Sequence, residues 1–489
     1  MAYQDLREWM KFLDEQGDLK RIQAEVDWDE EIGAITREIS SRYGPALLFE
    51  NIKDHRHTTC SRLFTNGTGS KKRVCWILGL PEETHYRDIV VAFKDRFSRP
   101  VPPKKVDWGP VKENIIKGKD IDLYQFPVPK WNPLDGGRYI MTSASVVTMD
   151  PETGIVNAGT YRGMISTKNT IGVLLATTQG WGKHFVKYRR EGREMPVAVV
   201  LGSDPTLFMV ASSPVSYPEY EMAGSLRQAP VELVKCETND LWVPAGAEIV
   251  LEGWVSPDPK TFEMEGPFSE YPGYYGGKRT PKHTVRVECI SHRNNPIFTG
   301  CLTGSSPGRT NEVTSWSPAS FSAVAWHQLE LSAVPNVLGV WRGMWPEVLR
   351  VQIRKAYRGH AQQVANALWG ASIGNYAAKH LIVVDEDIDI FDGEAIEWAL
   401  AYRVNAAMGD ISFFPGTPGS MLDPSVPIEE RNSVKYGHGK WTRVLIDATI
   451  NWELEPQEQY GGERYPPVGT AISAKMEETL KRRWKEYGF

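Results

Sequence analysis

The first stretch of the chain carries apolar side chains at intervals of three and four residues, which is the spacing of one face of a helix. The residues at this spacing within 5–17 are Leu6, Trp9, Met10 and Leu13. Gly17 follows them, and glycine commonly occupies the position just after a helix end. The pattern therefore predicts an amphipathic helix at the start of the chain that ends at Gly17.

The middle of the chain changes to short runs that are typical of strands. These runs are rich in Val, Ile, Thr or Ser, or alternate between apolar and polar residues, and they cover 140–149, 197–201, 248–255 and 284–290. In the last run Val285, Val287 and Cys289 alternate with other residues, as expected for a half-buried strand. We therefore predict a strand-rich middle region.

The last third of the chain alternates between helix-like and strand-like segments. Helices are predicted at 323–331, 359–368 and 392–403, a buried strand at 381–384 and a polar helix at 472–487. Asp392 is the expected N-cap of the third helix. A strand followed by a helix indicates a small α/β domain.

The length of the chain implies several domains. Its 489 residues exceed the ~250–300 residues at which a single core usually stops growing. Prolines at 100, 102 and 103 followed by two lysines predict a linker. We expect an N-terminal α/β module at 1–105, a middle domain at 106–310 and a C-terminal α/β domain at 311–489. The fold class is a multidomain α+β and α/β protein.

Composition excludes several classes of protein. With 41% hydrophobic and 11% aromatic residues the chain is not disordered, and a net charge of −5 provides no positive field for nucleic acid. No run approaches the ~18 apolar residues of a membrane span, and the first residues lack the apolar stretch of a signal peptide. Five widely spaced cysteines do not suggest a disulfide framework. We expect a cytoplasmic protein without membrane or nucleic-acid partners.

Two stretches of the middle region hold the most unusual chemistry. Residues 157–162 read Asn-Ala-Gly-Thr-Tyr-Arg, and residues 265–270 read Glu-Gly-Pro-Phe-Ser-Glu. The second stretch forms an acidic site from two carboxylates five residues apart, for which a strained turn with solvated ends is the alternative. Glu219 and Glu221 also lie among apolar residues, where a surface turn is the alternative.

In combination these stretches resemble the UbiD family of decarboxylases, which use prenylated FMN. The matching stretches, in family order, are 5–9, 157–162, 231–236, 248–253, 265–270, 384–389 and 446–449. The resemblance implies a flavin-binding middle domain like the split barrel of flavin-reductase folds. It also implies that the C-terminal domain mediates assembly into a homodimer or a larger homo-oligomer.

By this resemblance Arg162, Glu265 and Glu270 form the catalytic network beside the flavin. Loss of CO₂ from an aromatic acid leaves electrons that no side chain can hold, and the modified flavin serves as the electron sink. Arg162 tethers the substrate carboxylate and holds an acid in place. Glu270 is the expected proton donor, since the flavin and a second Glu raise its pKa. Glu265 bridges the other two and tunes that pKa.

The resemblance further implies that a divalent metal, Mn²⁺ or Mg²⁺, holds the phosphate of the flavin, with K⁺ nearby. The ligands of the family are an Asn, a His and a Glu, matched here by Asn157, His184 and Glu221. Oxygen and imidazole ligands suit such an ion. Glu219 is the alternative to Glu221. Lys379 can contact the phosphate, and a surface lysine is the alternative for it.

Other residues are expected around the flavin and the substrate. Those expected to line the flavin, besides the metal ligands, are Thr160, Tyr161, Arg162, Leu174, Leu175, Ala176 and Lys183. Ser420, Met421 and Leu422 belong to a loop similar to one near the pocket of hydroxybenzoate-type members. Met421 and Leu422 can pack against a flat ring and Ser420 can bond a ring hydroxyl or nitrogen, which favours an aromatic substrate.

The resemblance thus predicts a carboxy-lyase that reversibly and non-oxidatively decarboxylates an aromatic acid, either hydroxyaromatic or heteroaromatic, and releases CO₂. A separate flavin prenyltransferase is expected to supply the cofactor. Three alternatives stay open: a decarboxylase of an acrylic or cinnamic-type acid, a plain FMN oxidoreductase, and a non-catalytic subunit of a multi-subunit decarboxylase.

Overall fold

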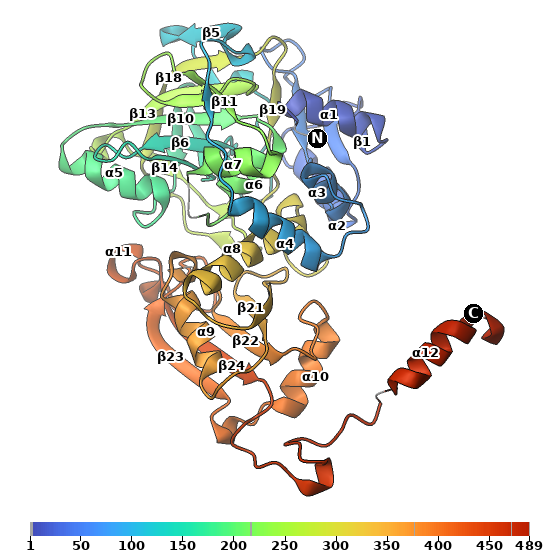
Figure 1. Ribbon diagram of the computed structural model, residues 1–489. Helices are drawn as coiled ribbons and strands as arrows, with labels where there is room; N and C mark the ends of the chain where they lie inside the picture. Colours follow the sequence, from blue (N-terminus) through green and yellow to red (C-terminus); the bar gives the residue numbers. More distant parts are fainter. Residues whose placement is uncertain (1–2, 216–217, 376, 471, 489) are drawn as a thin grey trace.

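The computed structural model describes residues 3–215, 218–375, 377–470 and 472–488 (Figure 1). The N-terminal segment, in blue, and the middle segment, in green, lie together, and the C-terminal segment, in orange, forms a second lobe. Helices α4 (Tyr86–Phe97) and α8 (Ser317–Leu331) pack on each other where the lobes meet. The strand-rich middle and the α/β C-terminal lobe confirm the predicted fold class.

The N-terminal segment is a small mixed sheet accompanied by helices. The sheet has the order β1-β2-β3-β19, from Leu19–Ile22, Ala46–Phe49, Arg62–Thr65 and Ile297–Thr299. The helices before α4 are α1 (Leu6–Glu15), α2 (Glu31–Ser41) and α3 (Lys71–Leu78). Because β19 comes from the end of the middle segment, the two segments share one sheet.

The opening helix has the predicted face and end. The four apolar residues that the pattern selected, Leu6, Trp9, Met10 and Leu13, are buried in α1. The Asp5 side chain accepts a hydrogen bond from the Glu8 N–H at the start of the helix, and Gly17 follows its end with a φ of +67°. Arg7 donates to Glu248 with bonds of 2.7 and 2.8 Å, which anchors the helix to the middle segment.

An eight-stranded antiparallel sheet forms the middle segment, in the order β7-β6-β10-β13-β18-β9-β8 with β5 paired to β18. The strands are β5 (Asn114–Lys117), β6 (Ser145–Met149), β7 (Val156–Gly159), β8 (Gly163–Thr167), β9 (Thr170–Val173), β10 (Met195–Leu201), β13 (Ile249–Val255) and β18 (Thr284–His292). The four predicted runs correspond to β6, β10, β13 and β18. In β18, Val285 and Val287 are buried and Arg286 between them is exposed, which confirms the half-buried pattern.

Helices and short strands complete the middle segment. They are α5 (Gly180–Arg190), α6 (Pro205–Ala211), α7 (Glu219–Arg227), β4 (Lys104–Lys105), β11 (Glu232–Lys235), β12 (Trp242–Pro244), β14 (Glu263–Glu265), β15 (Phe268–Ser269), β16 (Tyr275–Gly276) and β17 (Thr280–Lys282). The proline-rich connection is not a free linker, because β4 pairs in parallel with β11 and the Val101 N–H donates to the Glu221 carbonyl. The division into 1–105, 106–310 and 311–489 stays a prediction.

The C-terminal lobe is a five-stranded mixed sheet with helices, in the order β20-β21-β22-β24-β23. Its elements are β20 (Val337–Trp341), β21 (Val348–Ile353), β22 (His380–Asp385), β23 (Ile411–Pro418), β24 (Lys440–Ala448), α8, α9 (His360–Trp369), α10 (Gly393–Arg403) and α11 (Ser433–Tyr436). The predicted helices and buried strand are present. The Asp392 side chain accepts from the Glu394 N–H, so the predicted N-cap is confirmed.

Beyond β24 the chain leads away from the lobe to α12 (Ala474–Arg483), which stands apart from the rest of the molecule in Figure 1. This helix confirms the predicted polar helix near the end of the chain, and it buries none of its described residues. Nowhere in the described parts of the chain is a helix long and apolar enough to cross a membrane.

Candidate active site

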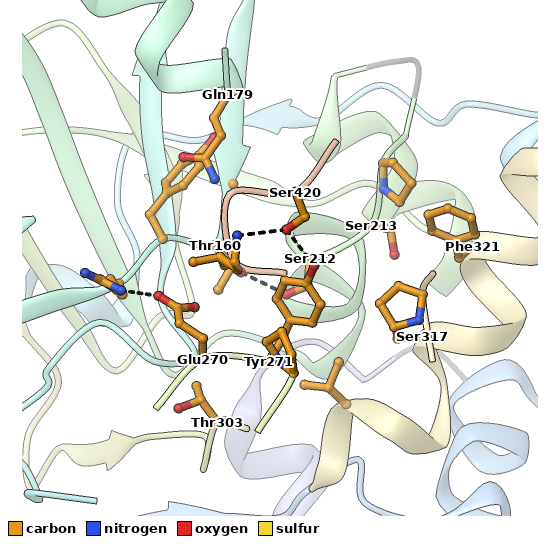
Figure 2. A pocket seen from close by; sticks show the side chains of 18 of the residues that line it. Thr160, Gln179, Ser212, Ser213, Glu270, Tyr271, Thr303, Ser317, Phe321 and Ser420 are labelled. Atoms are coloured by element: carbon orange, nitrogen blue, oxygen red, sulfur yellow. Dashed lines mark hydrogen bonds and ion pairs between the residues drawn. The ribbon is translucent and has the colours of Figure 1, made fainter. Parts of the chain in front are cut away.

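A cavity of about 890 Å³ lies between the middle segment and the C-terminal lobe. Arg162 and Glu270 of the middle segment line it, as do Arg342, Glu347 and Ser420 of the lobe. Figure 2 shows Glu270, Tyr271 and Ser420 gathered on its wall. Cofactor and small-molecule pockets occupy roughly 300–1,000 Å³, so this cavity lies near the upper end of that range.

Arg162 binds both of the predicted acidic residues at the wall of this cavity. Its Nη2 donates to Glu265 Oε2 at 2.9 Å, and its Nη1 donates to Glu270 Oε1. The side chains of Arg162, Glu265 and Glu270 are only 9%, 0% and 11% exposed. A planar guanidinium holds several donors in fixed directions, so it can engage two carboxylates at once. The structure therefore brings together the three residues to which the sequence analysis gave catalytic roles.

A hairpin of the middle segment sets the spacing of the two glutamates. Glu265 ends β14, Gly266 turns the chain with a φ of +92°, and Glu270 follows β15 directly. Gly276, in the paired strand β16, lies so close that a Cβ there would stand 2.7 Å from Glu270 Cγ. The glycines thus allow both carboxyl groups to approach Arg162.

The surroundings of Glu270 favour its protonated form. Burial raises the pKa of the Glu270 carboxyl, Arg162 opposes this increase, and the negative charges of Glu265 and Asp135 add to it. A carboxyl group with a raised pKa keeps its proton to higher pH, as a proton donor must.

Tyr139 is a further partner of this network that the sequence analysis missed. Its hydroxyl donates to Glu265 Oε1 at 2.9 Å, across a separation of 126 residues. Burial, and next the charge of Glu265, raise the pKa of Tyr139 far above its usual value, so it stays a donor. Nothing in the local pattern around Tyr139 indicates a contact with so distant a residue.

Asn157 and His184 come together through the β6–β7 ladder. Asn157 in β7 is the register partner of Thr148 in β6, and Thr148 Oγ1 lies 3.0 Å from His184 Nδ1. Burial lowers the pKa of His184, so its ring is neutral near pH 7. Since Nδ1 contacts Thr148, Nε2 is the ring nitrogen suited to a metal ion.

Glu219, rather than Glu221, lies next to Asn157, because it contacts the following residue. Glu219 Oε2 accepts a hydrogen bond of 3.0 Å from the N–H of Ala158, the residue after Asn157, and burial raises its pKa. Glu219 lines the cavity, whereas Glu221 is not among the described lining residues. Two steps along an α-helix turn a side chain by about 200°, so these glutamates of α7 face different ways. The structure therefore favours Glu219, the alternative left open above, and the metal-ligand set stays a prediction.

Helix α5 begins beside Asn157. A Cβ on Gly180, the first residue of the helix, would lie 1.8 Å from Asn157 Oδ1, so any larger residue there would displace the Asn157 side chain. The first turn of a helix carries a partial positive charge, which favours a phosphate group, although the Trp181 N–H of this turn already donates to the Tyr161 hydroxyl at 3.3 Å. Lys183 lines the cavity one turn later. This end of the cavity therefore suits an anion beside the proposed metal ligands.

The other expected flavin-lining residues divide into two groups. Thr160, Tyr161, Leu174, Ala176 and Lys183 border the cavity. Leu175 is buried in the hydrophobic core and does not appear in the described lining, because successive side chains of an extended segment point in opposite directions. His184 does not appear in that lining either, nor does Thr148, which contacts His184 and is the register partner of the cavity-lining Asn157.

The C-terminal lobe supplies the opposite wall. Ser420, Met421 and Leu422 line it, and their contact with a substrate stays a prediction. Lys379 also borders the cavity, but its Nζ donates to Asp423 Oδ2 at 2.9 Å and to Ser425 Oγ at 2.7 Å. These bonds hold Lys379 within the lobe, which disfavours the expected phosphate contact.

The residues present fit a flavin mononucleotide and a divalent ion. The buried Nε of Arg162 has no hydrogen-bond partner among the residues that the structure describes, so a donor is available to a ligand there. Asn157, His184 and Glu219 offer an amide oxygen, an imidazole nitrogen and a carboxylate, which suit Mn²⁺ or Mg²⁺. Within the described residues no group of three or more His, Cys, Asp or Glu side chains could hold a metal. The proposed set is compatible with that finding, because it contains only two such side chains, His184 and Glu219. Its other ligands would be the Asn157 amide oxygen and oxygens of the flavin phosphate.

Three family models match successive parts of the chain. Their descriptions are the N-terminal domain, the Rift-related domain and the C-terminal domain of the 3-octaprenyl-4-hydroxybenzoate carboxy-lyase UbiD, and they match residues 10–93, 104–306 and 319–448. Together these matches extend over all three segments of the structure.

Similar proteins match over nearly the whole length. The chain is 34% identical to phenolic acid decarboxylase of Sedimentibacter hydroxybenzoicus, with 99% of each chain covered. It is 31% identical to pyrrole-2-carboxylic acid decarboxylase of Pseudomonas aeruginosa, with 99% of this chain and 98% of that protein covered.

Solved structures agree with these matches. Vanillic acid decarboxylase of S. hydroxybenzoicus in its closed form superimposes with a TM-score of 0.87 at 34% identity, over 99% of this chain and 100% of that one. HmfF of Pelotomaculum thermopropionicum, a UbiD-class enzyme in complex with FMN, gives a TM-score of 0.77 at 30% identity, over 97% and 98%. This chain therefore belongs to the UbiD family of carboxy-lyases.

Proposed function

We propose that this protein catalyses the reversible, non-oxidative decarboxylation of an aromatic carboxylic acid with prenylated FMN as its cofactor. One observation carries the proposal: the Arg162 guanidinium binds Glu265 and Glu270 together at the wall of a cavity of cofactor size. The names of the similar phenolic acid and pyrrole-2-carboxylic acid decarboxylases support an aromatic substrate. HmfF, solved with FMN and in an evolved dimeric form with prenylated FMN, supports the cofactor.

Each residue of the network has a distinct task. When bound, prenylated FMN supplies the electron sink that CO₂ loss requires. Arg162 attracts the substrate carboxylate and orients it. Glu270, in its protonated form, delivers its proton to the ring carbon that lost CO₂, so that one substrate carboxylate and one proton yield CO₂ and a neutral ring with hydrogen at that carbon. Glu265, held by Arg162 and Tyr139, fixes the guanidinium in place.

The far wall would receive the substrate ring. Met421 and Leu422 present apolar surface and Ser420 a hydroxyl group, which suits a flat ring that bears a polar substituent. This combination favours a hydroxyaromatic or heteroaromatic acid over an acrylic one.

Asn157, His184 and Glu219 would hold Mn²⁺ or Mg²⁺ at the phosphate of the flavin. The convergence of β7, α5 and α7 at one end of the cavity supports this assignment. A K⁺ ion near the site rests on the family resemblance alone. Free, buried cysteines agree with a cytoplasmic location, and assembly into a homodimer or larger homo-oligomer is expected.

Production of the protein with and without a flavin prenyltransferase tests the proposal. We expect prenylated FMN in the released cofactor, identified by mass spectrometry, and CO₂ release from hydroxybenzoic or pyrrole carboxylic acids only after production with the prenyltransferase. Ordinary FMN with a nicotinamide-dependent reaction would identify an oxidoreductase, and absence of any flavin would identify a non-catalytic subunit. Turnover of cinnamic acid alone would identify the acrylic alternative.

A further inference from the structure

We propose that Tyr271 is a positioning residue through which the C-terminal lobe holds the loop that carries Glu270. The contact is a property of the fold, and its effect on catalysis rests on the proposed function. Glu270 and Tyr271 follow β15 as neighbours in the chain. Figure 2 shows their side chains diverging, with Tyr271 directed toward Ser420 and Glu270 directed away from it.

The Tyr271 hydroxyl has two partners, and both belong to the C-terminal lobe. It lies 3.0 Å from Glu347 Oε1 and 2.9 Å from Ser420 Oγ. Glu347 immediately precedes β21, and Ser420 follows β23. One hydroxyl group of the middle segment therefore joins two separate loops of the lobe at the wall of the cavity.

The donors and acceptors of this contact form a chain. Burial raises the pKa of Tyr271 well above its usual value, so the hydroxyl keeps its proton. Since a hydroxyl has one proton to donate, Tyr271 donates to Glu347 and accepts from Ser420. Ser420 Oγ in turn accepts from the Leu422 N–H at 3.2 Å. Hydrogen bonds linked in this way reinforce one another and are costly to break singly.

Short backbone bonds link this contact to Glu270. The Glu270 N–H donates to the Tyr274 carbonyl at 3.0 Å, and the Gly273 N–H donates to the Glu270 carbonyl at 2.9 Å. The Ser305 N–H donates to the Tyr271 carbonyl at 3.3 Å. Because Tyr271 adjoins Glu270 within a turn closed by two internal bonds, displacement of Tyr271 is expected to displace Glu270. A misplacement of about 1 Å at a reacting group can cost about 100-fold in rate.

Hydrogen exchange measured by mass spectrometry on the flavin-loaded protein tests the contact without any substrate. We expect Ser420→Ala, a change in the C-terminal lobe, to raise amide exchange about 10-fold or more in the peptide that contains residues 268–276 of the middle segment. Tyr271→Phe should do the same, because it removes only the hydroxyl. Tyr274→Phe is the matched control in this loop, since Tyr274 is 61% exposed, and it should leave exchange unchanged. Wild-type exchange in both Ser420→Ala and Tyr271→Phe would overturn the proposal.

The pH profile of decarboxylation tests the effect on Glu270, which is faced by Arg162, Glu265 and Asp135. A loosened loop admits water, which lowers the raised pKa of Glu270 toward its usual value. Because Glu270 works in its protonated form, the decline of kcat at high pH should move to lower pH in Tyr271→Phe and in Ser420→Ala. The double variant Tyr271→Phe/Ser420→Ala should shift this decline of kcat no further than either single variant does.

Other kinetic outcomes would reject the positioning role. If the high-pH decline of kcat in Tyr271→Phe stays where it is in the wild type while KM rises, Tyr271 is a substrate contact instead. If the losses of activity in the two single variants add in the double variant, Tyr271 and Ser420 act independently. If the wild-type enzyme decarboxylates no aromatic acid, the proposed function fails, whereas the exchange experiment still decides whether the lobe holds the loop.

Discussion

Asn157 and Thr148 face each other across the β6–β7 ladder, and this pairing places Asn157 beside His184, whose Nδ1 contacts the Thr148 hydroxyl. Glu219 joins them because it accepts a hydrogen bond from the N–H of Ala158. Two strands and two helices thus bring together three polar groups that lie far apart along the chain.

Glu219→Gln should weaken metal binding about 10- to 100-fold, the usual cost of altering an ionic ligand or its immediate support. The amide can still accept the Ala158 hydrogen bond, so the fold should persist. The amounts of metal and of flavin that stay bound after purification should both fall. Elemental analysis measures the metal, and absorbance measures the flavin. Glu221→Gln is the matched control on the same helix and should retain both. If Glu221→Gln lost the metal and Glu219→Gln kept it, the ligand assignment would be reversed.

Glu270→Gln should reduce decarboxylation about 10²- to 10⁴-fold, because general acid catalysis contributes about that factor. The neutral amide fills the same space but donates no proton to carbon. Flavin content should stay at the wild-type level, since Glu270 is not among the proposed phosphate or metal ligands. Normal turnover with normal deuterium incorporation from D₂O would remove Glu270 from this role.

Arg162→Lys should reduce kcat/KM about 100-fold although the charge is kept. A single ammonium group cannot reproduce the planar fork that contacts Glu265 and Glu270 together. Arg190→Lys, on the exposed side of α5, is the matched control and should be silent. Equal activity of the two variants would show that bridging by Arg162 has no role in turnover.

Activity should decline with rising pH through the pKa of Glu270. The protonated carboxyl is the working form, so it is fully present below this pKa and is lost above it. Burial raises the pKa, so the decline should lie at higher pH than for an exposed glutamate, whose pKa is about 4.3. The pH dependence of kcat in CO₂ release measures it. A decline already complete near that unperturbed value would contradict the assignment.

Arg7→Ala should lower the free energy of unfolding by about 2 kcal/mol, because it leaves the buried Glu248 carboxylate without its main charged partner. Lys11→Ala on the same helix is the control, since the Lys11 side chain is 77% exposed. Chemical denaturation of both variants measures the difference. Equal stability would mean that the Arg7–Glu248 contact contributes nothing measurable and that α1 is held by its apolar face and its other polar contacts.

Local features of the fold were predictable because the interactions that define them lie within a few residues. The apolar face of α1 follows from the spacing of Leu6, Trp9, Met10 and Leu13. The start of α10 follows from the short side chain of Asp392, which bonds an N–H two residues later. The order of the motifs likewise indicated the family and the network of Arg162, Glu265 and Glu270.

The choice between Glu219 and Glu221 needed the tertiary structure. Both belong to one turn of α7, and the count of residues along the chain does not say which side of that helix faces the cavity. The same holds for Tyr139 and for the contact of Tyr271 with Glu347 and Ser420, which join distant segments. The sequence alone predicted the helices and strands with a clear local pattern and the chemical groups of the site, since the former depend on near neighbours. Only the tertiary packing, within the middle segment and between the lobes, decided which groups meet, because burial and long-range hydrogen bonds select one side of each helix and strand.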